Sequence, residues 1–295
     1  MRKKYYSLGL VGYPLQHSIS PLLHTCALKT SGLTGDYRLY PVEPLPTGKE
    51  KLRAVVQRLM TGQISGLNVT IPHKTAIIKE IDKLSSAANL IGAVNTIYLR
   101  SGLVFGDNTD AGGFKLDLEW FISESGRSDD INNNITPKQA LVLGAGGAAR
   151  AVVHSLVQNG WKVIIAARNI TNSEAIAHSM IINGSVSSIS SIRLNIKSIS
   201  LIKDSISLIV NATPVGMWPD ASNCPWPLDL DFPPHGLVYD LVYKPRQTKL
   251  IKLAREQGLP AVNGIGMLVE QAALAFELWT GISPSRDEMY RAINT

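Results

Sequence analysis

Hydrophobic and polar positions along this chain form two patterns that follow one another repeatedly. Short, nearly continuous apolar runs of strand length recur from the N-terminus onwards. Longer stretches with apolar residues three or four positions apart separate most of these runs, which is the spacing of an amphipathic helix. One such stretch, residues 49–60, places five apolar side chains on a single helical face: Leu52, Val55, Val56, Leu59 and Met60. Strands that alternate with helices predict an α/β fold with mostly parallel sheets.

Local stop signals and the length of each apolar run place the expected elements. Strands are expected at residues 6–11, 36–42, 64–69, 140–143, 162–167, 207–212, 237–241 and 261–262. Helices are expected at residues 20–30, 49–60, 110–122, 245–257, 267–280 and 285–294, with others from Pro72 and from the glycine run at 144 to about 159. A hairpin is expected at 93–106, a loop at 123–139, and an ambiguous stretch at 179–207 with a helix around 196–203. Ser20 is expected to cap the helix that begins at Pro21.

One short glycine-rich run, Gly144 to Arg150, follows a buried strand and leads into a helical pattern. Gly144 permits a tight turn, and Gly146 lets the backbone come close to a pyrophosphate at the N-terminus of the helix. An ordinary strand–turn–helix corner would show the same glycines. However, a second strand at residues 162–167 follows the helix, as a βαβ unit requires. The run therefore predicts a nucleotide-binding turn.

The segment directly after that second strand indicates which dinucleotide binds. NAD sites usually carry Asp or Glu there, which accepts a hydrogen bond from the ribose 2′-OH, whereas an NADP site needs a cation. This chain has Arg168 at that position, and no acidic residue occurs from Gly160 to Ser173. A guanidinium can pair with a 2′-phosphate in a two-pronged geometry, although a solvated arginine at a strand end is also common. The sequence favours NADP over NAD.

Composition and charge narrow the class of protein. The chain has 295 residues, 45% of them hydrophobic, and a formal net charge of +6, which fits one large or two modest globular domains. The basic residues are scattered and are not interleaved with aromatic residues, so nucleic acid is not an expected partner. An anionic cofactor and a carboxylate substrate account for the positive net charge equally well.

No segment is expected to enter a membrane or to direct secretion. The longest apolar stretch near the C-terminus, residues 267–279, is interrupted by Glu270, Gln271 and Glu277, and is too short and too polar to span a bilayer. The basic N-terminus leads directly into a strand pattern and lacks the cleavage site of a signal peptide. Only two cysteines are present and they are far apart in sequence, which favours a reducing cytoplasm.

A ketone that accepts a hydride needs a proton donor beside it, because the alkoxide charge is otherwise uncompensated. The Tyr-x-x-x-Lys pair of short-chain reductases is absent, and the histidines and cysteines do not cluster as a zinc site would require. His73 is expected at the surface near a helix start. What remains is a lysine with a carboxylate: Lys74 follows Asn68 and Thr70 at a predicted strand end, and Asp110 lies at another such end. Open α/β sheets bind ligands at that end of their strands.

Eight short motifs follow one another along nearly the whole chain: residues 17–21 (HSISP), 68–74 (NVTIPHK), 92–96 (GAVNT), 107–110 (DNTD), 144–150 (GAGGAAR), 211–217 (NATPVGM), 239–243 (YDLVY) and 264–271 (GIGMLVEQ). In sequence and in order they resemble the shikimate dehydrogenase family. The resemblance implies NADP-linked interconversion of 3-dehydroshikimate and shikimate, a step towards chorismate and the aromatic amino acids. It implies NADP as the cofactor and a small-molecule substrate, with no nucleic acid or membrane partner, in a monomer or homodimer.

The same resemblance implies roles for individual residues. Lys74 would exchange the proton at the reacting oxygen, with Asp110 hydrogen-bonded beside it. Ser18 and Ser20 would hold the substrate carboxylate. Further contacts to the substrate hydroxyls or carboxylate would come from Thr70, Asn95, Asp110, Tyr243 and Gln271. The residues lining the cofactor would be Gly144, Ala145, Gly146, Gly147, Ala148, Arg168, Thr213, Gly264 and Met267. Ser20, Asn95 and Gln271 also have plain structural explanations, as a helix cap, a turn residue and a core amide.

Two domains are expected. Residues 1–111, completed by the C-terminal helices at 264–295, would form an α/β substrate-binding domain, and residues 112–263 would form a doubly wound Rossmann domain for NADP. The active site is expected in the cleft between them, closing by a hinge motion. One departure concerns the cofactor: many family members carry a second arginine shortly after the cofactor strand, whereas residues 167–172 keep only Arg168. An NAD-dependent quinate/shikimate dehydrogenase is the nearest alternative. A catalytically silent metabolite sensor is another, although such a protein could have lost Lys74 or Asp110.

Overall fold

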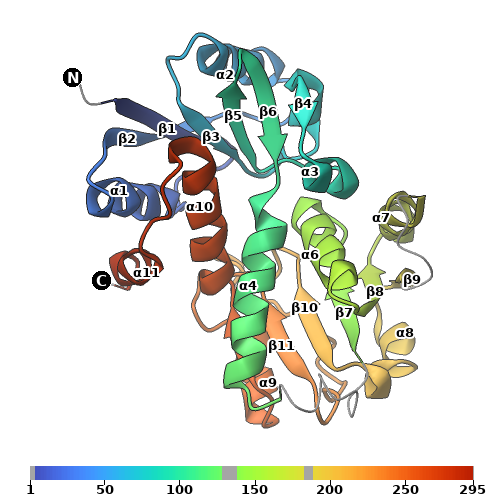
Figure 1. Cartoon of the computed structure of the whole chain (residues 1–295). Helices are drawn as coiled ribbons and strands as arrows, with labels where there is room; N and C mark the ends of the chain where they lie inside the picture. Colours follow the sequence, from blue (N-terminus) through green and yellow to red (C-terminus); the bar gives the residue numbers. More distant parts are fainter. Residues whose placement is uncertain (1–3, 128–137, 183–188, 295) are drawn as a thin grey trace. The chain divides into compact units, whose positions relative to one another are not determined.

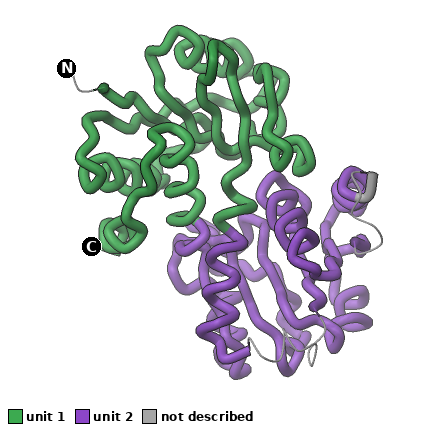
Figure 2. The backbone as a smooth tube through the Cα atoms, in the orientation of Figure 1, with its two compact units in different colours: residues 1–113, 268–295 green, residues 114–267 purple. Residues whose placement is uncertain are grey.

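The computed structural model describes residues 4–127, 138–182 and 189–294. The chain forms two compact α/β units, coloured separately in Figure 2. Unit 1 contains residues 1–113 and 268–295, and unit 2 contains residues 114–267. The α/β class predicted from the alternating pattern is confirmed.

Unit 1 is built on a mixed six-stranded sheet in the order β2-β1-β3-β5-β6-β4. The neighbours β2, β1 and β3 are parallel, whereas β5 runs antiparallel to both β3 and β6. The strands are β1 (Tyr5–Gly12), β2 (Thr34–Pro41), β3 (Gly66–Val69), β4 (Lys83–Leu84), β5 (Thr96–Arg100) and β6 (Leu103–Asp107). The helices wholly within this unit are α1 (Ser20–Thr30), α2 (Lys49–Met60), η1 (Ala76–Glu80), α3 (Ser86–Ile91) and α11 (Arg286–Ala292).

Unit 2 is a doubly wound domain with a parallel six-stranded sheet in the order β12-β11-β10-β7-β8-β9. The strands are β7 (Gln139–Leu143), β8 (Lys162–Ala167), β9 (Ile189–Arg193), β10 (Leu208–Asn211), β11 (Leu237–Asp240) and β12 (Ala261–Asn263). The helices wholly within it are α6 (Gly147–Gln158), α7 (Ile170–Ile182), α8 (Ile196–Ser200), η2 (Lys203–Ser205) and α9 (Lys249–Glu256). This strand order has the switch point of a Rossmann fold between β7 and β10.

Side-chain alternation along the strands of unit 2 explains why helices cover both faces of its sheet. Val163 and Ile165 on β8 pack in the hydrophobic cluster that contains α6 and α7 residues, whereas Ala166 packs in the cluster that contains α9 residues. Figure 1 shows α4 and α6 lying over one face of this sheet. Parallel strands buried on both faces read as continuous apolar runs, which is how β7 and β8 appear in the sequence.

Two helices contribute residues to both units. They are α4 (Thr109–Glu124), which crosses the boundary after residue 113, and α10 (Ile265–Thr280), which crosses it after residue 267. The first turn of α4 and most of α10 therefore belong to unit 1. Their polar residues Asp110 and Gln271 belong to that unit with them.

Several elements differ from the sequence prediction. The helix expected from Pro72 is instead a turn followed by the short 3-10 helix η1 (Ala76–Glu80). The helix α9 begins at Lys249 rather than near 245, because the Thr248 side chain caps it by accepting a hydrogen bond from the Ile251 backbone N–H. Most of the loop expected at residues 123–139 lies outside the described residues.

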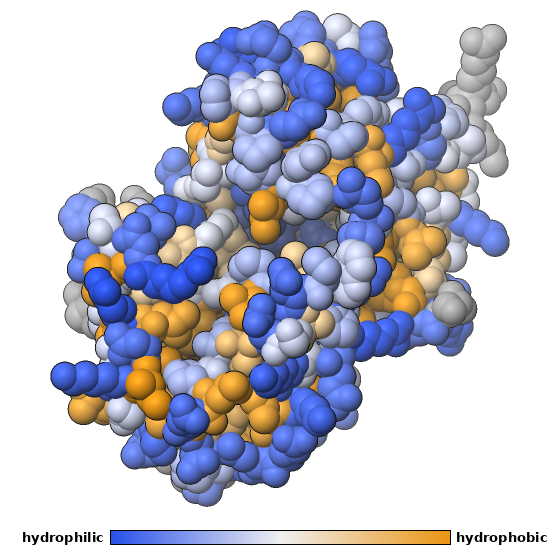
Figure 3. Space-filling model, turned by 180° about the vertical axis from the view of Figure 1, so that it is seen from behind, coloured by the Kyte–Doolittle hydropathy of each residue, from blue (hydrophilic) through white to orange (hydrophobic). Residues whose placement is uncertain are grey.

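In Figure 3, hydrophilic side chains cover much of the visible face, with hydrophobic side chains in groups among them. Within the described ranges, no helix combines the length and the apolar character needed to cross a bilayer.

Candidate active site

Lys74 and Asp110 form a buried ion pair in unit 1. Lys74 lies in the turn after β3, and Asp110 lies in the first turn of α4. The lysine Nζ donates to Asp110 Oδ2 at 2.5 Å, and the two side chains are 14% and 7% exposed. A short, charge-assisted hydrogen bond away from bulk water fixes the ammonium group in one position. This arrangement brings together the two residues predicted to carry the chemistry.

Asn95 holds the second oxygen of that carboxylate. Its Nδ2 donates to Asp110 Oδ1 at 2.8 Å and to Thr109 Oγ1 at 2.9 Å. Its Oδ1 accepts the Thr109 backbone N–H at 2.7 Å. Gln271 of α10 lies beside it, with Oε1 3.4 Å from Asn95 Nδ2. The fold thus gathers four predicted site residues from four separate segments of the chain.

Further polar side chains extend this network through the interior of unit 1. Thr96 Oγ1 donates to Asn95 Oδ1 at 3.0 Å, and Asn68 Nδ2 donates to Thr96 Oγ1 at 3.3 Å. Tyr37 Oη in turn donates to Asn68 Oδ1 at 2.8 Å. The sequence prediction missed Tyr37, Thr96 and Thr109. The one available signal was their polarity within otherwise buried strands or next to them.

The serine pair lies at the other end of this network. Ser18 Oγ and Ser20 Oγ are 3.2 Å apart, and the Ser20 backbone N–H donates to Ser18 Oγ at 3.3 Å. Burial raises the pKa of Tyr37 well above its usual value, and a hydrogen bond with the Ser20 side chain opposes this shift. The prediction that Ser20 caps α1 is wrong: Ile19 occupies the N-cap, and no side-chain cap bond is made. The Ser20 hydroxyl is therefore committed to side chains rather than to the helix backbone.

Thr70 and His73 lie between β3 and the lysine. The Thr70 backbone N–H donates to Val11 O at 2.9 Å, which fixes the chain just beyond the strand. The expectation that His73 lies at the surface is wrong, because its ring is fully buried and Nε2 lies 2.8 Å from Val42 O. The helix expected there is absent. The chain instead turns inward after Pro72 and places His73 under the strand end, where it anchors the turn that carries Lys74.

A second histidine, His24 of α1, is buried in the same unit. Its ring stacks on Tyr37 with centroids 4.4 Å apart and planes within 4°. Among the described residues neither ring nitrogen has a hydrogen-bond partner, and burial lowers the pKa of His24 to about 3, with the Asn68 side chain opposing the shift. His24 is therefore a neutral packing residue behind Tyr37.

In unit 2, the glycine run forms the tight turn that its sequence predicts. Gly144 has a φ of +111°, and a Cβ there would lie 2.9 Å from Thr213 Cγ2. Gly146 is the N-cap of α6, and a Cβ there would meet no atom within 4 Å. Gly146 is exposed and thus leaves its backbone open at a helix N-terminus. These residues fit the pyrophosphate of a dinucleotide.

The loop that follows β10 is held by a buried carboxylate. Asn211 Oδ1 accepts from the Thr213 backbone N–H at 3.0 Å and from Thr213 Oγ1 at 2.7 Å. Asn211 Nδ2 donates to Asp240 Oδ1 at 2.8 Å, and Thr248 Oγ1 donates to Asp240 Oδ2 at 2.6 Å. Burial raises the pKa of Asp240 to about 6, while hydrogen bonds from Thr248, the Val242 backbone and Asn211 oppose the shift. Asp240 therefore fixes Thr213 through Asn211.

The remaining predicted site residues also belong to unit 2. Arg168 is exposed directly after β8. The Gly264 backbone N–H donates to Val242 O at 3.3 Å, and Met267 is 7% exposed within the hydrophobic core. Burial raises the pKa of Tyr243, which follows β11. Tyr243 is thus the one predicted substrate residue that lies in unit 2.

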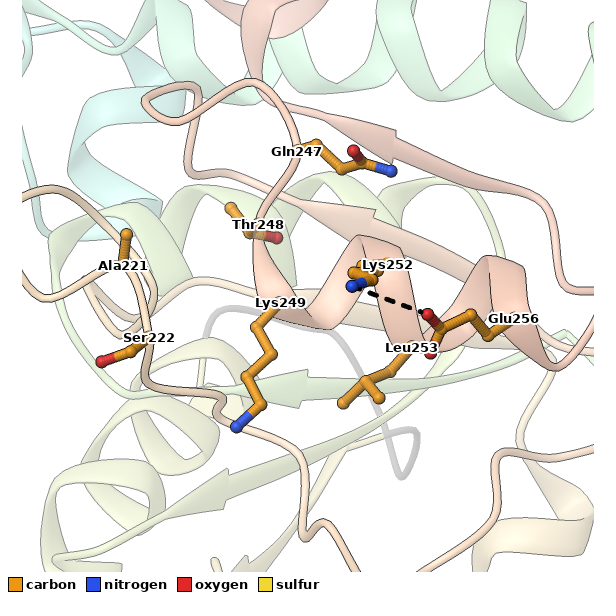
Figure 4. Close-up of a pocket in the computed structure, with 8 residues that line it drawn as sticks. All are labelled: Ala221, Ser222, Gln247, Thr248, Lys249, Lys252, Leu253 and Glu256. Atoms are coloured by element: carbon orange, nitrogen blue, oxygen red, sulfur yellow. Dashed lines mark ion pairs between the residues drawn. The ribbon is translucent and has the colours of Figure 1, made fainter.

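The pocket shown in Figure 4 is a separate feature of unit 2. It has a volume of about 440 Å³ beside α9, where Lys252 and Glu256 form an ion pair at 3.9 Å. None of the predicted site residues lines it. Across the described parts of the chain, no three His, Cys, Asp or Glu side chains are grouped as metal ligands.

Comparison with known proteins gives a consistent family assignment. Residues 10–97 match the family model "Shikimate dehydrogenase substrate binding domain", residues 128–213 match "Shikimate / quinate 5-dehydrogenase", and residues 264–293 match "Shikimate 5'-dehydrogenase C-terminal domain". A shikimate dehydrogenase (NADP(+)) of Methanocaldococcus jannaschii is 37% identical over 97% of this chain and 95% of the relative.

Two solved structures are also similar. The Thermus thermophilus shikimate 5-dehydrogenase in complex with NADP(H) and shikimate has a TM-score of 0.79 and 35% identity, and the match covers 98% of both chains. A quinate dehydrogenase from Corynebacterium glutamicum in complex with NAD has a TM-score of 0.84 and 27% identity, and the match covers 99% of both chains.

Proposed function

Because this chain belongs to the shikimate dehydrogenase family, we propose that it catalyses the reversible, NADPH-dependent reduction of 3-dehydroshikimate to shikimate. The protein is an NADP-dependent oxidoreductase that acts on a CH–OH group. This reaction belongs to the route to chorismate and the aromatic amino acids. The observation that carries the proposal at the level of residues is the Lys74–Asp110 pair, which is held on its second carboxylate oxygen by Asn95.

Lys74 is proposed as the residue that exchanges a proton with the substrate. The hydride for the carbonyl carbon would come from bound NADPH. The ammonium of Lys74 would donate a proton to the carbonyl oxygen as that oxygen becomes a hydroxyl. Asp110 keeps the ammonium in position through its 2.5 Å hydrogen bond. A positioned general acid of this kind contributes roughly 10²–10⁴ in rate.

The other polar side chains of unit 1 suit a polyhydroxylated carboxylic acid. Ser18 and Ser20 offer paired hydroxyls for the carboxylate, while Thr70, Asn95 and Gln271 offer hydroxyl and amide groups for the ring hydroxyls. A site built to hydrogen-bond hydroxyl groups rejects analogues that lack them, since its own polar groups would be left unpaired.

The domain roles follow from the same proposal. Residues 1–111 with 264–295 would bind the substrate, and residues 112–263 would bind NADP. The open turn at residues 144–148, with Arg168, Thr213, Gly264 and Met267, would hold the cofactor. The support is the Rossmann strand order of unit 2 and the open backbone at Gly146.

The cysteines bear on where the protein is located. Cys26 and Cys224 are both free thiols, as expected in a reducing compartment, so we place the protein in the cytoplasm. We further propose that it acts as a monomer or a homodimer.

A steady-state assay with purified protein tests the function. Initial rates of cofactor reduction would be measured with shikimate or quinate against NADP⁺ or NAD⁺. We expect fast turnover with shikimate and NADP⁺, and its loss in Lys74→Ala. Binding of shikimate without turnover in any combination would contradict the enzyme assignment and favour a metabolite sensor.

One alternative substrate and cofactor pair has specific support. The similarity to a quinate dehydrogenase in complex with NAD, together with the single arginine after β8, makes an NAD-dependent quinate/shikimate dehydrogenase the second candidate. Comparable kcat/KM values for quinate, or for NAD⁺, in the same assay would establish it.

A further inference from the structure

A second arginine reaches the sheet edge that carries Arg168. Strands β8 and β9 are parallel neighbours, and Ala167 pairs with Arg193 in their register. The Leu194 backbone N–H donates to Ala167 O at 2.9 Å, so the pairing continues to the end of both strands. The carboxyl ends of parallel strands lie at the same edge. Arg193 therefore stands next to the residue that precedes Arg168.

The register also indicates the face on which the Arg193 side chain leaves the sheet. Residues paired in adjacent parallel strands share a face, and faces alternate along each strand. Val163 and Ile165 pack with residues of α6, and Ala167 lies on their face two positions further along. Its partner Arg193 accordingly lies on the side of the sheet that α6 covers. The glycine turn leads into that same helix.

The chain segments that carry the two arginines contain no acidic residue within five positions of either one. Both side chains are exposed, and no ion pair of either one is seen among the described residues. No Asp or Glu occurs at residues 160–173 or 189–203, and Lys197 adds a third exposed cation shortly after Arg193. Cations at one sheet edge repel each other when no counter-charge lies close by, so an anion bound there is stabilised.

We propose that Arg193 and Arg168 together bind the 2′-phosphate of NADP, which makes Arg193 a specificity-determining residue. The inference rests on the proposed function. Residues 167–172 supply only one arginine, and the adjacent strand supplies the second. A phosphate monoester carries nearly two negative charges at neutral pH and presents three acceptor oxygens, so two guanidinium groups match it better than one.

The test compares Arg193→Gln with Lys162→Gln. Lys162 is an exposed cation at the opposite end of β8, so this control removes the same charge from the strand next to that of Arg193 but away from the proposed phosphate. The ratio of kcat/KM for NADP⁺ to that for NAD⁺ is measured with shikimate. We expect Arg193→Gln to lower this ratio roughly tenfold to hundredfold, as for the loss of charge-assisted hydrogen bonds, and Lys162→Gln to leave it within about twofold.

A binding measurement separates this inference from the function itself. Adenosine 2′,5′-bisphosphate and adenosine 5′-monophosphate are titrated into each variant, and neither requires turnover. Weaker binding of the bisphosphate alone in Arg193→Gln supports the inference even if shikimate is not the substrate. An unchanged preference for the bisphosphate, or an equal loss for both nucleotides, overturns it.

Discussion

Breaking the buried pair of Lys74 and Asp110 should separate stability from catalysis. Lys74→Met removes the ammonium and leaves the Asp110 carboxylate buried at 7% side-chain exposure without a cation. Removing one partner of a buried pair costs roughly 3–5 kcal/mol. Asn95 still donates to the other oxygen of Asp110 at 2.8 Å. We therefore expect the lower end, about 3 kcal/mol, which corresponds to a fall in Tm of about 6–12 °C for a unit of this size.

The double variant Lys74→Met with Asp110→Asn should recover most of that loss. An asparagine removes the unpaired charge and keeps an oxygen that can accept from Asn95. Asp110→Asn alone should cost about 1–2 kcal/mol, because the longer lysine is partly exposed and can reach water. If the double variant keeps a loss of about 1 kcal/mol, the cycle gives a coupling free energy of about 3–4 kcal/mol.

Catalytic activity should stay low even in the variant whose stability is restored. Every variant without Lys74 should have kcat lowered by roughly 10²–10⁴, including the double variant whose fold has been restored. Stability is measured by thermal and urea denaturation, and activity by initial rates with shikimate and NADP⁺. The reasoning is refuted if the double variant is no more stable than Lys74→Met, or if it regains turnover.

Three further predictions concern buried groups outside this pair. The pKa of His24 is about 3 in the folded protein, below its unfolded value of 6.5, so the unfolded chain binds a proton first as the pH falls. The free energy of unfolding should therefore fall by about 2 kcal/mol from pH 7 to pH 5 through this group. His24→Phe should remove this pH dependence in urea denaturation, and an unchanged pH dependence would contradict the prediction. The pKa of Asp240 is about 6, above its unfolded value of 3.8, so its contribution has the opposite sign. It raises the free energy of unfolding by about 1 kcal/mol from pH 7 to pH 5. Asp240→Asn should remove this gain, so the variant should lose stability relative to the wild type as the pH falls from 7 to 5. A Cβ on Gly266 would lie 1.7 Å from Asp117 Oδ1, and the Asp117 carboxylate is buried and accepts a hydrogen bond from Tyr239. Gly266→Ala should therefore lower Tm by roughly 5–10 °C. A Tm equal to that of the wild type would show that the contact relaxes freely.

The parts of this molecule that depend on local sequence were predictable. The bounds of α2 and β8 agree with those predicted from apolar spacing, because each needs only its own periodicity and flanking residues. The glycine turn at residue 144 was predicted for the same reason. The family assignment came from short motifs whose order along the chain can be read directly.

The polar network of unit 1 could not be predicted in the same way. Tyr37, Asn68, Thr96 and Thr109 are far apart in sequence. They meet because β2, β1, β3 and β5 follow one another across the sheet and because β5 runs antiparallel to β3. Nothing local specifies that register. The wrong prediction for His73 has the same origin, since its burial depends on Val42, which lies beyond another strand. The proposal that Arg168 and Arg193 bind one phosphate likewise depends on which strand lies beside β8.

The division of unit 1 between the two ends of the chain has a consequence for biosynthesis. Domains generally fold as units while the polypeptide emerges from the ribosome, the N-terminal ones first. Here residues 114–267 are all synthesised before the segment 268–295, which supplies Gln271 and packs Phe276 and Met289 into the core of unit 1. The nascent chain can therefore complete the proposed nucleotide-binding unit while the proposed acid–base site still lacks Gln271. A chain that ended near residue 267 is expected to hold the cofactor without turning over the substrate.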